Sequence, residues 1–144
     1  MGEDSGCHLF VFGTLRHGHA RGVESSLLRG AVLVGAAWMR GRLYLVADYP
    51  GAIDADDPSS VVRGEVWRVE DERILPELDA YEECGPEDPE PHLYRRERRP
   101  VTLAGGRSVD AWVYLYNRSL AGLAVIPSGD FREAPIPRPP APRR

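Results

Sequence analysis

The chain has 144 residues, a formal net charge of -4 and an isoelectric point near 5.6. This length suits a single domain with its own core, and the acidic balance gives no overall attraction to nucleic acid or to an anionic membrane. Cys7 and Cys84 form neither a CxxC motif nor a secreted disulfide framework. The sequence lacks a long apolar run and a basic, signal-like start, so we expect a cytoplasmic protein without nucleic-acid or membrane partners.

Strand-like segments separated by glycine-containing turns make up most of the chain. Each segment is short and rich in apolar, β-branched or aromatic residues, which favour strands. In chain order they are residues 8–12, 31–39, 41–46, 61–69 and 109–116. With five or six strands and few helices, the sequence predicts the α+β class with a strand-dominated core.

Two helical segments are predicted between these strands. The first covers residues 21–30 and ends at Gly30, a residue type that commonly terminates helices. The second covers residues 71–84, with Pro76 either in its first turn, where proline is tolerated because the first backbone N–H groups lack helical partners, or at a break in the helix. Both helices are therefore short elements beside the strands.

Two further segments are too rich in proline for regular structure. Residues 82–92 are acidic and also contain glycine, which predicts a surface loop after the second helix. Residues 135–144 are dense in proline and predict an extended, solvated tail. The domain is accordingly assigned to residues 1–134, with residues 135–144 as a proline-rich tail.

The first predicted strand runs directly into Gly13. A glycine at this point lets the chain turn so that the N–H groups of Thr14, Leu15 and Arg16 face outward together. Such a cluster of donors can bind a carboxylate or an oxyanion. The alternative is an ordinary strand-to-loop turn that needs glycine only for its backbone angle, and these residues alone leave both interpretations open.

The second predicted helix carries a carboxylate beside its apolar stripe. At about 100° per residue, the stripe consists of Ile74, Leu75, Leu78 and Tyr81. Glu82 falls at the edge of the stripe, whereas Asp79 and Glu83 fall on the polar side. A carboxylate at this edge loses hydration, which raises its pKa and suits it to proton transfer near neutral pH. The alternative is a Glu82 side chain that flanks the stripe and reaches solvent.

Four arginines follow the acidic loop on a predicted strand. Strand alternation puts Arg95 and Arg99 on one face and Arg96 and Arg98 on the other. We interpret them as charges that guard an edge strand against unwanted pairing, with a phosphate-binding strip as the alternative. Tyr94, directly after the loop, is placed so that its hydroxyl can reach back toward the site.

Metal and cofactor sites are not predicted. The four histidines show no ligand spacing with the two cysteines, and the nearby pair His17 and His19 is a weak metal signal. The chain also lacks a serine nucleophile elbow and a Walker-type phosphate loop. We therefore expect chemistry that uses the side chains and backbone of the protein alone.

The chain resembles the gamma-glutamylcyclotransferase-like family over residues 8–131. The segments that carry the resemblance, in the family's order, are LFVFGTLRHG, GRLYLVADYPGAI, VRGEVWRV, LDAYEE, YRRERRPV and AWVYLY. The family includes gamma-glutamylamine cyclotransferases and an enzyme that unmasks a gamma-glutamyl-protected antibiotic precursor. The resemblance implies a small mixed β-barrel with flanking short helices. It also implies release of 5-oxoproline and a free amine from a gamma-glutamyl amine or amide, a small-molecule substrate, without a cofactor.

The resemblance also implies which residues form the site. The family's catalytic glutamate maps onto Glu82, as general base and general acid. Its substrate-binding loop maps onto Phe12, Gly13, Thr14 and Leu15. We assign Tyr94 as a further substrate-binding residue. Because Phe12 stands where the family commonly has tyrosine, a second hypothesis is a non-catalytic small-molecule binding or interaction module on the same fold.

Overall fold

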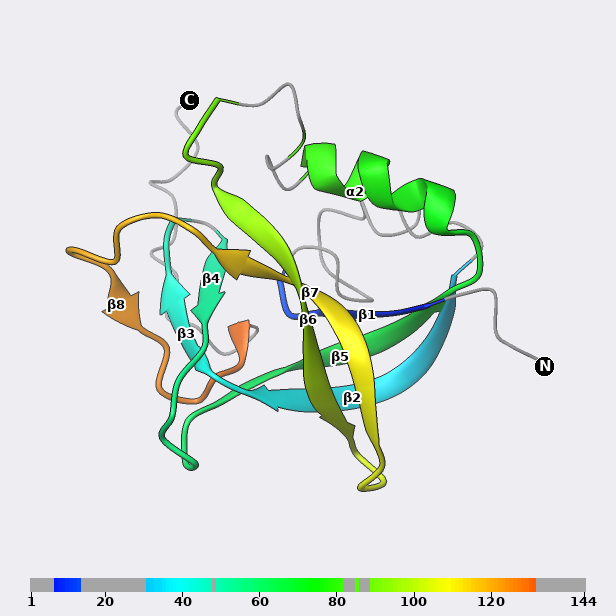
Figure 1. The fold of residues 1–144 in the computed structure, drawn as a ribbon. Helices are drawn as coiled ribbons and strands as arrows, with labels where there is room; N and C mark the ends of the chain where they lie inside the picture. The colour runs from blue at the N-terminus through cyan, green and yellow to red at the C-terminus, as the bar shows by residue number, and fades with distance from the viewer. Residues whose placement is uncertain (1–6, 14–30, 48, 82–84, 86–88, 132–144) are drawn as a thin grey trace, which may run out of the picture.

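A computed structural model of the protein describes residues 7–13, 31–47, 49–81, 85 and 89–131. The strands are β1 (Cys7–Val11), β2 (Val32–Arg40), β3 (Arg42–Leu45), β4 (Pro50–Ile53), β5 (Val61–Val69), β6 (Tyr94–Leu103), β7 (Ser108–Tyr116) and β8 (Ala124–Val125). A short 3-10 helix, η1 (Glu72–Ile74), leads into the helix α2 (Leu75–Tyr81). Figure 1 shows α2 lying across one side of the strands.

Five strands close into a barrel in the order β1-β5-β2-β6-β7. Neighbouring strands are antiparallel except β1 and β7, which run parallel and pair at Leu9 and Trp112. A smaller sheet of order β4-β3-β8 lies beside the barrel (Figure 1). The predicted class and the small mixed β-barrel are confirmed. α2 is one short flanking helix, and the helix predicted over residues 21–30 lies outside the described residues.

Side-chain alternation along β1 divides the core into two layers. Phe10 belongs to a cluster in the barrel interior, whereas Leu9 and Val11 belong to a second cluster that includes Leu75 and Leu78 of α2. Leu75 and Leu78 are buried, and each contributes roughly 1.5–3 kcal/mol in lost contact with water. The outer face of β1 is thus apolar because α2 covers it.

Most predicted strands lie within a residue or two of the observed ones, and β5 matches residues 61–69 in full. Pro76 lies in the first turn of α2, as predicted. The sequence did not predict β4 or β8, because β4 begins with a proline and β8 has only two residues. Within the predicted loop 82–92, the described residues contain no helix or strand; the others lie outside the described residues. No described helix has the length and apolar character needed to cross a membrane.

Removal of residues 135–144 should leave the melting temperature within a few degrees of the full-length value. Proline-rich sequence has little apolar surface to bury, and the buried side chains of the described core extend to Phe131. Thermal unfolding of residues 1–134 and of the full chain, followed by circular dichroism, measures this difference. A larger drop would show that the tail packs on the domain.

Candidate functional site

The turn after β1 lies against the start of β4. A Cβ atom added at Gly13 would lie 2.9 Å from Cγ and Cδ of Pro50, closer than such contacts occur in proteins. Gly13 is therefore required by packing as well as by any need to expose backbone N–H groups. Gly13 is not among the glycines with a positive φ, so the interpretation that this turn needs glycine for its backbone angle is wrong, and the close approach of Pro50 is what requires it.

Tyr94, the first residue of β6, lies on the other side of the same proline. Its hydroxyl donates a hydrogen bond to the Pro50 carbonyl. Its buried ring packs edge-on against Tyr116, with ring centroids 6.1 Å apart, and against Tyr49 at 6.5 Å. A Cβ at Gly51 would lie 2.8 Å from the Tyr116 ring. Two tyrosines thus hold the start of β4 beside Gly13.

We call Gly13, Pro50, Gly51, Tyr94 and Tyr116 the Gly13 cluster. Its members come from the turn after β1, the start of β4, the start of β6 and the end of β7. Of the predicted site residues, the structure brings Gly13 and Tyr94 together through Pro50. Thr14, Leu15 and Glu82 lie outside the described residues.

The Phe12 side chain belongs to a different layer. It is buried in the barrel interior, and its ring centroid lies 6.0 Å from that of Phe10. Tyr94 belongs to the outer cluster, beneath α2. Phe12 therefore adds its backbone to the turn at Gly13, while its ring packs in the core.

Asp79 connects α2 to the barrel. Its carboxylate accepts hydrogen bonds from Arg96 Nε at 2.8 Å, from Arg96 Nη2 at 3.2 Å and from the Tyr114 hydroxyl at 2.7 Å. The helical periodicity placed Asp79 on the polar side of the helix, but only 19% of its side chain is exposed. The reason is that Arg96 and Tyr114 supply three donors, which compensate the carboxylate for lost hydration.

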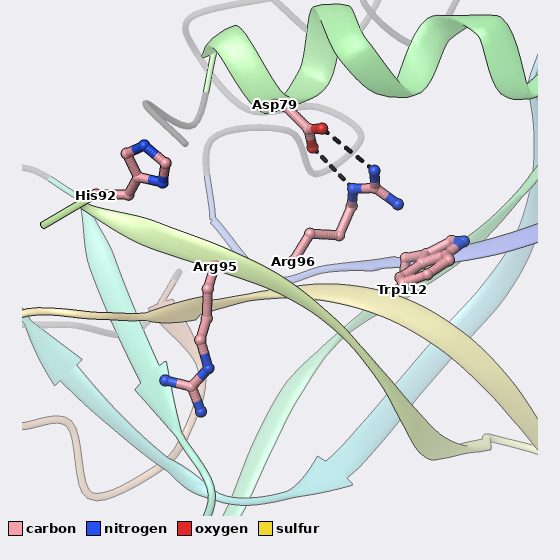
Figure 2. A pocket seen from close by; sticks show the side chains of 5 residues that line it. All are labelled: Asp79, His92, Arg95, Arg96 and Trp112. Atoms are coloured by element: carbon pink, nitrogen blue, oxygen red, sulfur yellow. Dashed lines mark hydrogen bonds and ion pairs between the residues drawn. The ribbon is translucent and has the colours of Figure 1, made fainter. Parts of the chain in front are cut away.

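The arginines of β6 alternate between faces as predicted. Arg96 and Arg98 both lie over the ring of Trp112 on β7, each with its guanidinium carbon 4.5 Å from the ring centroid. Figure 2 shows Arg95 extending to the opposite side of β6, where it contacts Glu97 at 3.3 Å. β6 lies between β2 and β7 in the closed barrel, so the interpretation of these arginines as guards of an edge strand is wrong; ion pairs and contacts with the Trp112 ring engage them instead.

An open cavity of about 330 Å³ lies next to the ion pair between Asp79 and Arg96. The residues that line it are Asp79, His92, Arg95, Arg96 and Trp112 (Figure 2). They come from α2, from the segment before β6, and from β6 and β7, so no local sequence motif contains them. Among the described residues, no group of three or more His, Cys, Asp or Glu side chains is arranged to hold a metal ion.

Glu65 of β5 is a further buried carboxylate that the sequence reasoning missed. Only 7% of the residue is exposed, and its Oε1 accepts a hydrogen bond from Trp67 Nε1 at 3.2 Å. It pairs with Val11, at the end of β1 before Gly13. Period-two alternation along β5 puts Glu65 on the same face as Trp67 and Val69, and this signal would have predicted its burial.

Asp54→Asn tests the ion pair between Asp54, which follows β4, and Arg99 of β6. This pair contributes no residue to the Gly13 cluster or to the cavity beside Asp79. Arg99 Nε and Nη2 donate to Asp54 at 2.9 and 2.8 Å, and this hydrogen bonding lowers the pKa of Asp54. Half of the carboxylate side chain is exposed, so the substitution should lower the free energy of unfolding by at most about 1 kcal/mol near pH 7.

The pH dependence follows from the direction of that shift. A lowered pKa in the folded state stabilises the fold above the ordinary value of 3.8, and the stabilisation is lost as the pH falls through the folded-state pKa. Urea unfolding near pH 7 and again at about pH 3 should therefore show a smaller difference between Asp54→Asn and wild type at the lower pH. A difference that grew on acidification would contradict this account.

Residues 9–133 match the family described as Gamma-glutamyl cyclotransferase, AIG2-like. This chain belongs to that family. It is 34% identical over 124 residues to the gamma-glutamylcyclotransferase family protein YtfP of Escherichia coli K12, covering 85% of this chain and 94% of that one. The family match over residues 9–133 includes Gly13, the helix α2, and the strands β6 and β7, which carry Tyr94 and Tyr116.

Two solved structures of gamma-glutamyl cyclotransferase relatives have the same fold. The solution structure of YtfP from Escherichia coli gives a TM-score of 0.62 at 34% identity, over 88% of this chain and 96% of that one. An AIG2-like protein from Mus musculus gives a TM-score of 0.62 at 26% identity, over 76% of each chain. This chain therefore shares its β-barrel fold with these two relatives.

Proposed function

We propose that this protein is a gamma-glutamyl cyclotransferase of the gamma-glutamylamine type, which releases 5-oxoproline and a free amine from a gamma-glutamyl amine or amide. The observation that carries the proposal is the family match, which covers residues 9–133. The meeting of Gly13 and Tyr94 around Pro50 supports it, because residues 81 positions apart in the sequence contact one proline.

Glu82 takes the first proton and returns it in the proposed reaction. As a carboxylate it takes a proton from the substrate's α-ammonium group, and the free amine then attacks its own γ-carbonyl carbon. Collapse of the tetrahedral intermediate breaks the γ-amide C–N bond, Glu82 gives its proton to the departing nitrogen, and the ring nitrogen loses its second proton to the released amine, which leaves as an ammonium ion. Because the attack is intramolecular, holding the γ-glutamyl chain in the folded conformation that brings its amine to the γ-carbonyl supplies much of the acceleration.

The turn at Gly13 has the role of holding the substrate's charge. Backbone N–H groups of Thr14, Leu15 and Arg16 bind the α-carboxylate or the oxyanion that develops on the γ-carbonyl. Phe12 contributes only its backbone, since its ring is buried in the barrel interior. Tyr94 contributes to the substrate site by holding the start of β4 in place, through the hydrogen bond from its hydroxyl to the Pro50 carbonyl.

Formation of 5-oxoproline from a panel of gamma-glutamyl compounds tests the proposal. The panel varies the leaving amine and includes gamma-glutamyl alkylamines, gamma-glutamyl lysine linked through the side chain, and gamma-glutamyl amino acids. The matched control for each is its α-glutamyl isomer, in which attack on the amide carbonyl cannot close a five-membered ring. Release of 5-oxoproline from one or more gamma-glutamyl compounds and from no α-glutamyl isomer is the expected result. Binding of the panel without turnover would instead identify a non-catalytic module.

A further inference from the structure

β6 and β7 present a series of facing side-chain pairs on the outer side of the barrel. From the Gly13 cluster outward, the facing pairs are Tyr94 with Tyr116, Arg96 with Tyr114, and Arg98 with Trp112. The first pair belongs to the Gly13 cluster. The second pair, two residues along each strand, binds Asp79 of α2. The anchor of α2 is therefore adjacent to the tyrosines that border the proposed site.

Asp79 is held by directional contacts from two strands. Arg96 donates through two nitrogens, Nε and Nη2, and Tyr114 donates its hydroxyl hydrogen to Oδ1. The side chains of Asp79 and Arg96 are 19% and 23% exposed, so the pair is largely shielded from water. Two-point binding of a carboxylate by a guanidinium fixes orientation as well as distance.

Trp112 restrains the arginine that makes these contacts. The guanidinium groups of Arg96 and Arg98 both lie 4.5 Å from the centroid of its ring. Stacking on an aromatic face limits the rotation of a guanidinium, so Arg96 is already oriented for Asp79 (Figure 2). The ring of Trp112 thus restrains the strand side of the contact with Asp79.

α2 needs such an anchor because it is short. Seven residues do not make a stable helix in isolation, and most of its stability must come from tertiary contacts. Leu75 and Leu78 bind it to the barrel by apolar burial, which has no preferred direction. The contacts of Asp79 are directional, and they fix the rotation of the helix about its axis.

We infer that Asp79 is a positioning residue, which fixes the helix immediately preceding Glu82 in the chain relative to the strands that carry Tyr94 and Tyr116. The inference rests on the proposed function, since the catalytic effect of Asp79 is exerted through Glu82. An error of about 1 Å in the placement of a catalytic group can cost a hundredfold in rate. Asp79 thereby affects the chemical step and leaves substrate affinity largely unchanged.

Asp79→Asn tests the inference against Asp54→Asn as a matched control. Both substitutions remove a carboxylate that binds two nitrogens of a β6 arginine, but Asp54 lies outside α2. For 5-oxoproline release, Asp79→Asn should lower kcat by roughly 10- to 100-fold and change KM by less than about twofold. Asp54→Asn should leave both values unchanged. Equal kcat in Asp79→Asn and wild type would overturn the inference.

A second arm separates positioning from a loss of stability. Asp79→Asn removes the carboxylate that Arg96 binds through Nε and Nη2, whereas Asp79→Asn with Arg96→Met removes both charged groups and should recover much of the melting temperature. We expect kcat to stay low in the double variant. Recovery of kcat together with the melting temperature in the double variant would overturn the inference, because an apolar contact would then position α2 as well as the Asp79–Arg96 ion pair does.

A third arm asks whether Asp79 acts through Glu82. In a Glu82→Gln background the general base is already absent, so adding Asp79→Asn should change the residual rate by less than about twofold. A further loss of the same size as in the wild-type background would show that Asp79 acts independently of Glu82 and would overturn the inference.

Hydrogen exchange makes the inference independent of turnover. Backbone amides of residues 77–81 should exchange about tenfold faster in Asp79→Asn than in wild type or Asp54→Asn. If wild type released no 5-oxoproline, the proposed function would fail, and this measurement would still decide whether Asp79 anchors α2. Unchanged exchange would overturn the anchoring whatever the activity.

Discussion

Glu82→Gln should lower kcat for 5-oxoproline release by about 10²- to 10⁴-fold. Glutamine keeps the size and shape of the side chain but cannot accept the proton of the substrate's α-ammonium group. The effect is measured as initial rates at saturating gamma-glutamyl substrate, with folding checked by circular dichroism. In wild type, kcat/KM should also rise with pH as Glu82 loses its proton, and this limb of the profile should be missing in Glu82→Gln.

Glu83→Gln is the matched control, since it changes the neighbouring carboxylate of the same segment. We expect its kcat to stay within about twofold of wild type. The choice rests on the resemblance, which maps the family's catalytic glutamate onto Glu82, and both glutamates lie outside the described residues. Loss of activity in Glu83→Gln with full activity in Glu82→Gln would reassign the catalytic carboxylate.

Gly13→Val should abolish most activity, by more than about a hundredfold, and should also lower the free energy of unfolding by about 1–3 kcal/mol. Its Cβ alone would lie 2.9 Å from two atoms of the Pro50 ring, and the Pro50 carbonyl is in turn held by the Tyr94 hydroxyl. The turn and the start of β4 must therefore separate, which disturbs both sides of the proposed substrate cradle. Steady-state kinetics and urea unfolding measure the two effects.

Gly105→Val provides the control for a glycine outside the site. No atom lies within 4 Å of a Cβ built at Gly105, which occupies the turn between β6 and β7. We expect this variant to keep near-normal kcat. Equal loss of activity in two soluble, folded variants would count against the role of the turn at Gly13.

The sequence predicted those parts of the fold that local pattern determines. Strand β5 was predicted with its observed bounds, because a run of β-branched and aromatic residues between turn signals has few other structures open to it. Of the predicted apolar stripe, Leu75 and Leu78 are buried in α2, because helical periodicity is also a local pattern, whereas Ile74 is only partly buried and lies in η1. Strand β4 was missed because its four residues begin with proline and contain glycine.

Contacts between distant segments could not be predicted in this way. Asp79 binds Arg96 and Tyr114, which lie 17 and 35 residues away, and a helical wheel can only assign an aspartate to the polar side. Gly13 and Tyr94 were predicted individually, but their contact through Pro50 needed the structure. Glu82, Thr14 and Leu15 lie outside the described residues, so their roles stay predictions.

The parallel pairing of β1 with β7 has a consequence for the order in which the chain can fold during synthesis. Among the five barrel strands, β1 leaves the ribosome before the others, and its partner at Trp112 lies on the last of the five to be made. Contacts this far apart in sequence form late, because the intervening chain must first be ordered. On the ribosome, the nascent barrel therefore stays open along β1 until β7 has emerged.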